Sequence, residues 1–447
     1  VLALAVVHGP LSAQSAQMGE REAEGERLAR ALGCGGCHTG VPFDEGIRSV
    51  APPLGTNEVP FAPAYVFAYL ADPRAVRPDI APARMPRFDL TEAERLALSL
   101  FATNERELQG VDDAFRSAQN RHPGVARSTG RDVFLNLGCG GCHVHPEVDA
   151  SQLAPDLASQ GIRVREAWLT EYLSTPTTVR PAGAVPGRGS RMPDFRLTPD
   201  EVGALTAFLM ARRDGVIPAW QADPLSPFSM QKAETLLRDR WSCLGCHELG
   251  EDGGRIGPGL DGLAHRLTPA FVRAFVEDPG HLAPGTVMPA SLEQTDRLDL
   301  IASFLVQRPG SWTPAERTEG LSLAPAFEDE AAAAPGPGRP TADAGGRLYQ
   351  RRCASCHGVE GAGDGFNAPY LPVTPTVHAD AEAMALRPDD TLYDGIHAGG
   401  WILGKSHRMP AFGASLSPVE IRSLVAYIRQ LCGCEGPEWS RDGRRGS

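Results

Sequence analysis

Four copies of the pattern Cys-x-x-Cys-His constrain this chain more than any other feature. Eight of its ten cysteines belong to them, and the copies span Cys34–His38, Cys139–His143, Cys243–His247 and Cys353–His357. This pattern is the signature of covalent haem attachment. Each thiol adds to a vinyl group of the porphyrin, and the histidine that follows is carried beneath the ring as a ligand of the iron. The sequence therefore predicts four covalent c-type haems.

Two other uses of paired cysteines fit less well. A thiol–disulfide redox site needs only Cys-x-x-Cys, without the histidine and without four copies. Zinc sites combine Cys-x-x-Cys pairs, but they lack a histidine directly after each pair. The sequence favours haem attachment at all four motifs, through the thiols of Cys34, Cys37, Cys139, Cys142, Cys243, Cys246, Cys353 and Cys356.

The motifs begin at residues 34, 139, 243 and 353, so the chain repeats about every 105 residues, which is typical of tandem domains. A helical segment precedes each motif. After it comes a short proline turn, at Ala51–Leu54, Ala154–Leu157, Gly257–Leu260 and Ala368–Leu371. In the first three repeats an amphipathic helix follows and stops at a proline, namely Pro73, Pro176 or Pro279.

Each repeat then has a Met-Pro pair and a final helix. The pairs are Met85-Pro86, Met192-Pro193, Met288-Pro289 and Met409-Pro410. Capping boxes predict where the final helices begin, since a hydroxyl and a Glu or Gln three residues later can pair with the end amides. These boxes are Thr91 with Glu94, Thr198 with Glu201, Ser291 with Gln294, and Ser417 with Glu420.

This order of elements resembles the class I cytochrome c family over residues 25–436, and the fourth repeat is most like it. The resemblance implies an all-α fold of four tandem cytochrome c-like domains, each wrapped around one haem. It also implies His/Met axial pairs: His38/Met85, His143/Met192, His247/Met288 and His357/Met409. The proline carbonyls of Pro52, Pro155, Pro258 and Pro369 are expected to hold the Nδ1 hydrogens of the proximal histidines.

The repeats and the stretches between them predict the domain limits. We expect domains at 20–105, 122–214, 228–310 and 344–436, an Ala-, Pro-, Gly- and acid-rich linker at 311–343, and a tail at 437–447. The linker has no periodic apolar pattern and is expected to be extended or mobile.

Composition bears on partners and location. The formal net charge of −12 argues against nucleic acid and favours a basic protein partner. Residues 1–17 resemble the apolar core and cleavage region of a secretory signal peptide without its basic start, so export, for instance to the periplasm, is expected. No apolar segment has the length of a membrane span, so any membrane attachment is expected through a partner.

The expected function is one-electron transfer rather than catalysis, because His/Met ligation fills both axial positions of each iron. We expect a multihaem carrier in a respiratory chain, with redox proteins as partners. The second hypothesis is the cytochrome subunit of a larger oxidoreductase complex, and the third is a peroxidase-type haem enzyme, which needs one iron without a sixth ligand.

Several ligand questions stay open at this level. Met288 has the most divergent surroundings of the four methionines. Rival histidine ligands are His145, His265, His281, His378, His397 and His407, of which His407 is nearest to Met409 in sequence. Cys432 and Cys434 lack a following histidine. A disulfide across the one residue between them is expected to be strained, a bond to a partner chain and free thiols are the alternatives, and the sequence does not decide.

Overall fold

The computed structural model describes residues 11–56, 61–73, 85–103, 113–147, 154–183, 191–291, 295–308, 310, 313–315, 321 and 339–440. The fold is all-α, as predicted, with one short antiparallel pair of strands, β1 (Glu248–Leu249) and β2 (Asp252–Gly253), in the described residues. Two compact units make up the chain. Unit 1 comprises Val1–Thr177, Ser190–Val216 and Ser322–Pro325, and unit 2 comprises Thr178–Gly189, Ile217–Leu321 and Ala326–Ser447.

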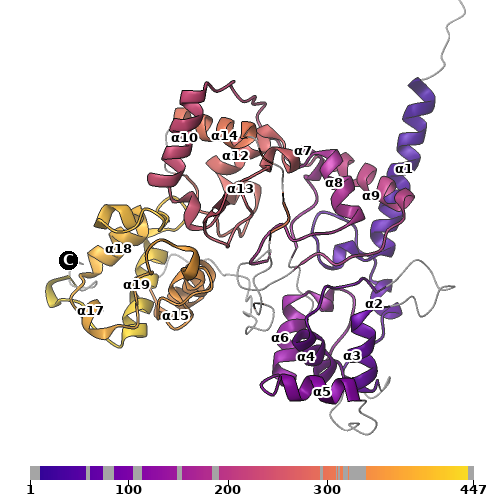
Figure 1. Cartoon of the computed structure of the whole chain (residues 1–447), viewed down its shortest axis with the longest axis horizontal. Coiled ribbons are helices and arrows are strands. Elements are labelled where there is room, and N and C mark those ends of the chain that lie inside the picture. The colour runs from indigo at the N-terminus through magenta and orange to yellow at the C-terminus, as the bar shows by residue number, and fades with distance from the viewer. Residues whose placement is uncertain are drawn as a thin grey trace, which may run out of the picture. The chain divides into compact units, whose positions relative to one another are not determined.

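Unit 1 holds the first two motifs within nine α-helices of the described residues (Figure 1). These are α1 (Leu11–Ala31), α2 (Gly46–Val50), α3 (Pro63–Ala71), α4 (Glu92–Ala102), α5 (Asp113–Arg121), α6 (Arg127–Asn136), α7 (Gln160–Arg163), α8 (Glu166–Ser174) and α9 (Pro199–Ala211). The 3₁₀ turns η1 (Cys34–Gly36) and η3 (Cys139–Gly141) form its cysteine motifs.

Unit 2 holds the other two motifs. Its described helices are α10 (Pro227–Asp239), α11 (Leu263–Arg266), α12 (Pro269–Glu277), α13 (Pro279–Leu282), α14 (Thr295–Gln307), α15 (Ala342–Arg352), α16 (Ala354–His357), α17 (Ala381–Ala385), α18 (Asp389–Ala398) and α19 (Pro418–Cys432). The 3₁₀ turns are η4 (Ser242–Gly245), η6 (Ala368–Tyr370), η7 (Gly400–Leu403) and η8 (Glu438–Ser440).

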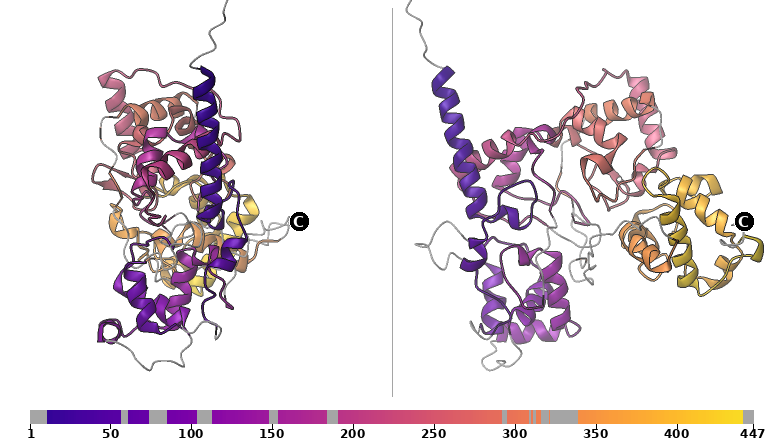
Figure 2. Two further views of the ribbon diagram at one scale, coloured as in Figure 1. Left: turned by 90° about the vertical axis from the view of Figure 1, so that its right-hand side faces the viewer. Right: turned by 180° about the vertical axis from the view of Figure 1, so that it is seen from behind.

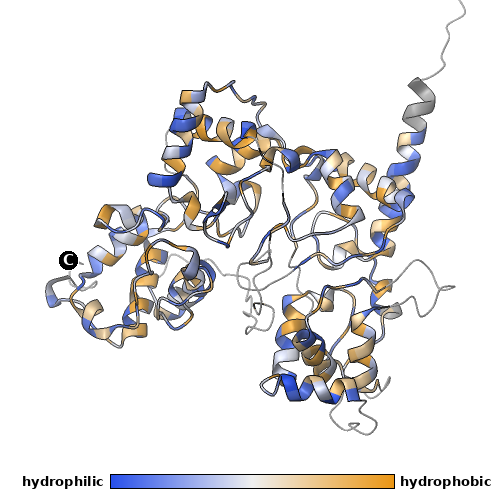
Figure 3. Cartoon of the chain, in the orientation of Figure 1, coloured by the Kyte–Doolittle hydropathy of each residue, from blue (hydrophilic) through white to orange (hydrophobic). Residues whose placement is uncertain are grey.

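Capping boxes and prolines in the sequence predict where many of the helices begin or end. Capping boxes form at Thr91, Thr198 and Ser417, each with the carboxylate three residues on. Gln294, the partner expected for Ser291, lies outside the described residues, and α14 is described from Thr295. The amphipathic helices α3, α8 and α12 end shortly before the prolines that were expected to stop them. Apolar and polar residues are interspersed along these helices, and the apolar ones supply the buried cores (Figure 3).

Helices of the first two repeats pair crosswise in unit 1. The helix before the first motif, α1, packs against α9, the final helix of the second repeat, and α6 packs against α4, the final helix of the first (Figures 1 and 2). Glycines let the backbones meet: a Cβ on Gly25 would overlap the carbonyl oxygen of Ala204, and one on Gly130 would overlap that of Ala97. In the described part of unit 1, the first helix of each repeat therefore has its main packing partner in the other repeat.

Unit 2 pairs the same helices within each repeat. Helix α10 packs against α14, and α15 packs against α19, where a Cβ on Gly345 would overlap the carbonyl oxygen of Ser423. Helix α5 lies inside the stretch 105–122 that was expected to separate the first two domains, and it packs against α3 and α4.

The ends of the chain are described only in part. Residues 11–17, within the expected signal segment, belong to α1, and residues 1–10 lie outside the described residues. Most of the expected linker at 311–343 and residues 441–447 of the expected tail also lie outside them. None of the described helices combines the length and the apolarity that a membrane crossing requires.

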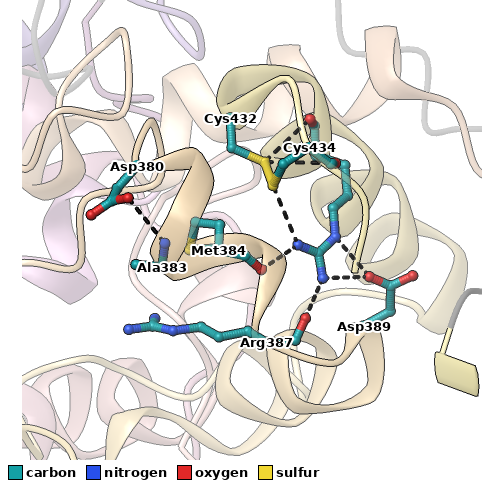
Figure 4. Close-up of a disulfide and its surroundings, with 8 residues drawn as sticks. Asp380, Ala383, Met384, Arg387, Asp389, Cys432 and Cys434 are labelled. Carbon is teal, nitrogen blue, oxygen red and sulfur yellow. Dashed lines mark hydrogen bonds and ion pairs between the residues drawn. A yellow bond between two sulfur atoms is a disulfide. The ribbon is translucent and has the colours of Figure 1, made fainter. Parts of the chain in front are cut away.

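Cys432 and Cys434 form a disulfide at the end of α19, which settles one of the questions left open by the sequence (Figure 4). Beside it, the guanidinium of Arg429 donates to Asp389 at 2.8 Å and to the carbonyl oxygen of Met384 at 2.7 Å. Arg429 also lies 3.8 Å from Sγ of Cys434. The disulfide thus belongs to the contact that fastens α17 and α18 to α19.

Candidate haem-binding sites

Each cysteine motif folds as one helical turn. The amide of the histidine donates to the carbonyl oxygen of the first cysteine, at 2.9 to 3.0 Å in the four copies, His38, His143, His247 and His357. Residues three and four positions apart share one face of a turn. Both thiols and the imidazole of each motif therefore face the same side, which is the arrangement that covalent attachment of a haem requires.

A carbonyl oxygen fixes the tautomer of every motif histidine. Because a carbonyl only accepts, the nearby ring nitrogen Nδ1 must carry the hydrogen, and Nε2 is left with its lone pair. The pairs are His38 with Pro155 at 2.8 Å, His143 with Pro52 at 3.0 Å, His247 with Pro258 at 2.7 Å, and His357 with Thr376 at 2.9 Å. An Nε2 lone pair held in this way suits a ligand of iron.

In unit 1 the proline carbonyls are exchanged between the repeats. Pro155 faces the histidine of the first motif and Pro52 faces that of the second, whereas Pro258 faces the histidine of its own repeat. Pro52 and Pro155 therefore each hold the histidine of the other repeat, and not that of their own.

A second hydrogen bond shows the same exchange. The leucine that ends each of the first three proline turns donates its amide to the residue after a motif histidine. Leu260 donates to Glu248 of its own repeat at 2.9 Å, but Leu157 donates to Thr39 at 2.9 Å and Leu54 to Val144 at 3.0 Å. The proline turns of unit 1 have therefore changed partners as whole elements.

The expected role of Pro369 is wrong. Thr376, seven residues further along, supplies the carbonyl oxygen that faces His357, and Pro369 lies inside the 3₁₀ turn η6. The imidazole of His378 stacks on that of His357, with ring centroids 4.2 Å apart. Thr376 and His378, two residues apart, thus both contact His357. The proline-turn pattern in the sequence did not predict these contacts.

Burial sets the protonation of the attachment groups. It lowers the pKa of all four motif histidines, opposed by the carbonyl contacts just described. It raises the pKa of the thiols of Cys34, Cys139 and Cys353 to about 12 in each case, and that of Cys37 to about 11. Desolvation is the leading cause throughout, so the imidazoles are neutral and the cysteines are thiols.

Two of the four expected methionine ligands pack in cores that include a motif cysteine. Met409 packs with Cys353 against the core of the fourth repeat. Met85 packs with Cys139, the first cysteine of the second motif, against a core built from α3, α4 and α6. Met192 and Met288 are half-buried.

The two attachment turns of unit 1 touch each other. A Cβ on Gly36 would lie 2.5 Å from the carbonyl oxygen of Gly141, and a Cβ on Gly141 would lie 2.7 Å from that of Gly36. The thiol of Cys37 also faces the carbonyl oxygen of Gly138 at 3.7 Å. This contact gives a physical reason for glycine before the second cysteine of both motifs, which the sequence pattern alone left unexplained.

Side chains join the two turns of unit 2. Asn367 is fully buried and donates to the carbonyl oxygen of Gly245 at 2.9 Å and to Sγ of Cys356 at 3.3 Å. Arg408 donates to the carbonyl oxygen of Leu244 at 3.0 Å and to Asp252 at 2.9 Å. Sequence reasoning missed Asn367, because a single asparagine before a proline turn carries no recognisable pattern.

The residues around the second motif fit an acidic cofactor. The buried guanidinium of Arg191 donates to Glu94 at 2.9 Å through Nη2, and its charge acts on Cys139. Its Nε and Nη1 are buried and have no hydrogen-bond partner among the described residues. Unpaired buried donors are costly, and a haem propionate is an anion that would satisfy them.

Three of the six rival histidines make packing or hydrogen-bond contacts that the structure describes. His145 is buried and stacks on Phe101 at 3.9 Å, and His378 is buried between Tyr349 and His357. His407 donates through Nε2 to the carbonyl oxygen of Arg238 at 2.8 Å. These contacts account for the three histidines as packing or hydrogen-bonding groups.

Two segments match models of known protein families. Residues 128–212 match "Cytochrome c", and residues 340–428 match "Cytochrome C oxidase, cbb3-type, subunit III". Both segments contain a cysteine motif, a proline turn and a Met-Pro pair in the family's order. The chain is a class I c-type cytochrome. Covalent haem, metal binding and electron transfer follow for this cytochrome from its family.

Comparison with solved structures gave distant similarities. A reducing HAO-like protein complex of Kuenenia stuttgartiensis is 19% identical, with 37% of this chain and 72% of that chain covered and a TM-score of 0.17. Thiosulfate dehydrogenase from Marichromatium purpuratum is 20% identical, with 95% and 93% covered and a TM-score of 0.18. Comparison of the cytochrome with curated proteins gave no match.

Proposed function

We propose that this cytochrome carries four covalent haems and passes electrons one at a time through them. The observation that carries the proposal is the common geometry of the motif histidines, His38, His143, His247 and His357. In all four, a carbonyl oxygen holds the Nδ1 hydrogen and leaves Nε2 for an iron. A haem at each motif would supply a redox-active iron, and the chain would supply its attachment, its orientation and a buried site.

Methionine as the sixth ligand of each iron supports electron transfer rather than catalysis. The proposed distal ligands are Met85, Met192, Met288 and Met409. A thioether that fills the sixth position leaves no place for a substrate, and it stabilises the ferrous state relative to a second imidazole. Packing of Met85 with Cys139 and of Met409 with Cys353 is consistent with this role.

The contacts between attachment turns support electron exchange inside each unit. In unit 1, Gly36 and Gly141 meet, and in unit 2, Asn367 joins Gly245 to Cys356. Electron transfer slows steeply with distance, so haems that are attached to touching turns are well placed to exchange electrons. The proposed carrier therefore consists of two haem pairs.

Partners and location follow from charge and from the chemistry of attachment. A net charge of −12 suits a redox partner with a basic docking surface. We propose that the cytochrome works outside the cytoplasm in a respiratory chain, either alone or as the electron-transferring subunit of an oxidoreductase complex.

Two measurements test the proposal. Mass spectrometry of the denatured, mature protein should give the mass of the chain plus four haems, and three or fewer would contradict four attachment sites. An optical redox titration should then show only low-spin haems that take up one electron each. A five-coordinate, high-spin haem that reacts with hydrogen peroxide would favour the enzyme hypothesis instead.

A further inference from the structure

We propose that the axial ligands of unit 1 are crossed, with His38 and Met192 on one iron and His143 and Met85 on the other. This inference rests on the proposed His/Met ligation and deepens it. It replaces the pairs His38/Met85 and His143/Met192, which assume that each repeat completes its own haem site.

The first step is the exchange of whole elements. The second motif receives the carbonyl of Pro52 and the amide of Leu54, both from the first proline turn. Its preceding helix α6 packs on α4, which closes the first repeat. The proline turn and the final helix that contact the second motif thus both come from the first repeat.

The second step is the position of Met85. This methionine packs with Cys139 against a core that contains Leu70 of α3, Phe101 of α4 and Val133 of α6. These helices share that core with the first cysteine of the second motif. Met85 lies six positions before Thr91, the N-cap of α4, so the methionine is tied closely to that helix.

The third step applies the same connection to Met192. It lies six positions before Thr198, the N-cap of α9. Helix α9 packs on α1, which leads into Cys34. The proline turn of the same repeat supplies Pro155 to His38. Met192 is therefore tied to the elements that surround the first motif.

The arginines before the methionines agree with this assignment. In unit 2, Arg408 reaches Leu244 and Asp252 of the third repeat while Met409, the next residue, packs in the core of the fourth. In unit 1, Arg191 donates to Glu94 of α4, the helix that shares a core with Cys139. In unit 2, the arginine and the methionine of the pair thus belong to the sites of two different repeats. The crossed assignment does the same in unit 1, because it places Arg191 at the second motif and Met192 at the first.

Crossed ligation redraws the domains of unit 1. The core that includes Cys139 is built from described residues between Leu54 and Cys139, in which the proline turn and the final helix come before the motif. The surroundings of the first motif are split between residues 11–45 and 154–211. The second haem site is therefore inserted into the first, and the limits 20–105 and 122–214 do not separate them.

A variant that lacks one haem tests the pairing in the full chain. Cys34→Ser with Cys37→Ser leaves three haems, and the sulfur-to-iron absorption of the ferric protein counts those that have methionine. In this background, Met85→His should lower the band by about one third, whereas Met192→His should leave it unchanged because its haem is absent. Met18→His, at a position that is 68% exposed, is the matched control and should also leave it unchanged.

The opposite response would be a loss of about one third of the band with Met192→His and none with Met85→His, and it would overturn the crossing while keeping methionine ligation. No response to either substitution would overturn methionine ligation at that haem, and the crossing with it. The reciprocal background, Cys139→Ser with Cys142→Ser, should exchange the two responses.

A measurement on the intact protein covers the case in which these variants fail to fold. In the ferrous state, the haem ring protons that show nuclear Overhauser contacts to the methyl group of Met85 should also show them to the side chains of Cys139 and Cys142. Contacts to Cys34 and Cys37 instead would refute the crossed pairing.

Discussion

The side-chain amide of Asn367 donates a hydrogen bond of 2.9 Å to the carbonyl oxygen of Gly245, which joins the attachment turns of the third and fourth motifs. Its oxygen accepts from the amide of Arg255 at 2.6 Å, so both ends of this fully buried side chain are paired. The contact makes the two repeats of unit 2 depend on each other.

Asn367→Ala should lower the free energy of unfolding of unit 2 by about 1–3 kcal/mol, because it leaves the buried groups of Gly245 and Arg255 without their partner. Chemical denaturation followed by the absorption of the haems would measure the change. Asn120→Ala, at an exposed position on α5, is the control and should be nearly neutral. An equal loss in both variants would show that the bridge contributes nothing specific.

Gly141→Ala should destabilise unit 1 by about 1–3 kcal/mol, since its Cβ would press on the backbone of Gly36 and force the turns apart. Gly203→Ala is the matched control, because a Cβ on that helical glycine of α9 would meet nothing within 4 Å. The control should stabilise the unit by up to about 1 kcal/mol. Thermal unfolding would compare the two, and a stabilising Gly141→Ala would argue against contact between the turns.

Met409→His should lower the reduction potential of one haem and leave the others unchanged, because imidazole favours ferric iron more than a thioether does. Met384→Leu, a buried methionine of the same core, is the control and keeps the volume of the side chain nearly constant. Redox titration would report both. A shift with Met384→Leu, or none with Met409→His, contradicts the assignment of Met409 as the ligand.

Glu92 gives unit 1 a stabilising contact that depends on pH. Hydrogen bonds from Arg121 and His122 lower the pKa of this carboxyl group from 4.5 to about 2. A lowered pKa in the folded state means that the contact stabilises the fold above about pH 4.5 and that the stabilisation is lost as the pH falls toward 2. Glu92→Gln should therefore be less stable than the parent at neutral pH, by an amount that shrinks below pH 4.5. A constant difference across that range, measured by urea unfolding, would contradict the contact.

Local sequence signals predicted much of this fold. Thr91 and Thr198 start their helices as the capping boxes indicate, and the helices before Pro73 and Pro176 end as expected. Such signals depend on neighbours within one or two turns, so a single sequence contains them completely. The all-α class followed from the same residues.

The partners of these elements were less predictable. The first two repeats carry equivalent proline turns and final helices, so Pro52 and Pro155 can each satisfy either His38 or His143 with the same local chemistry. Exchange of equivalent elements costs little contact energy, and the connections between the elements then decide the outcome. For Thr376 the reason is different, because a backbone carbonyl that acts as an acceptor leaves no trace in the type of side chain.

The insertion of one haem site into another gives unit 1 an order of assembly. A chain is made from its N-terminus, and each part can fold only after its last residue has appeared. The apolar core that includes Cys139 is complete once the second motif has been made, whereas the helix before Cys34 waits for α9, which ends at Ala211. The first motif to emerge is thus the later one to gain its surroundings, and Cys34 and Cys37 spend the longest time as accessible thiols on an unfinished chain.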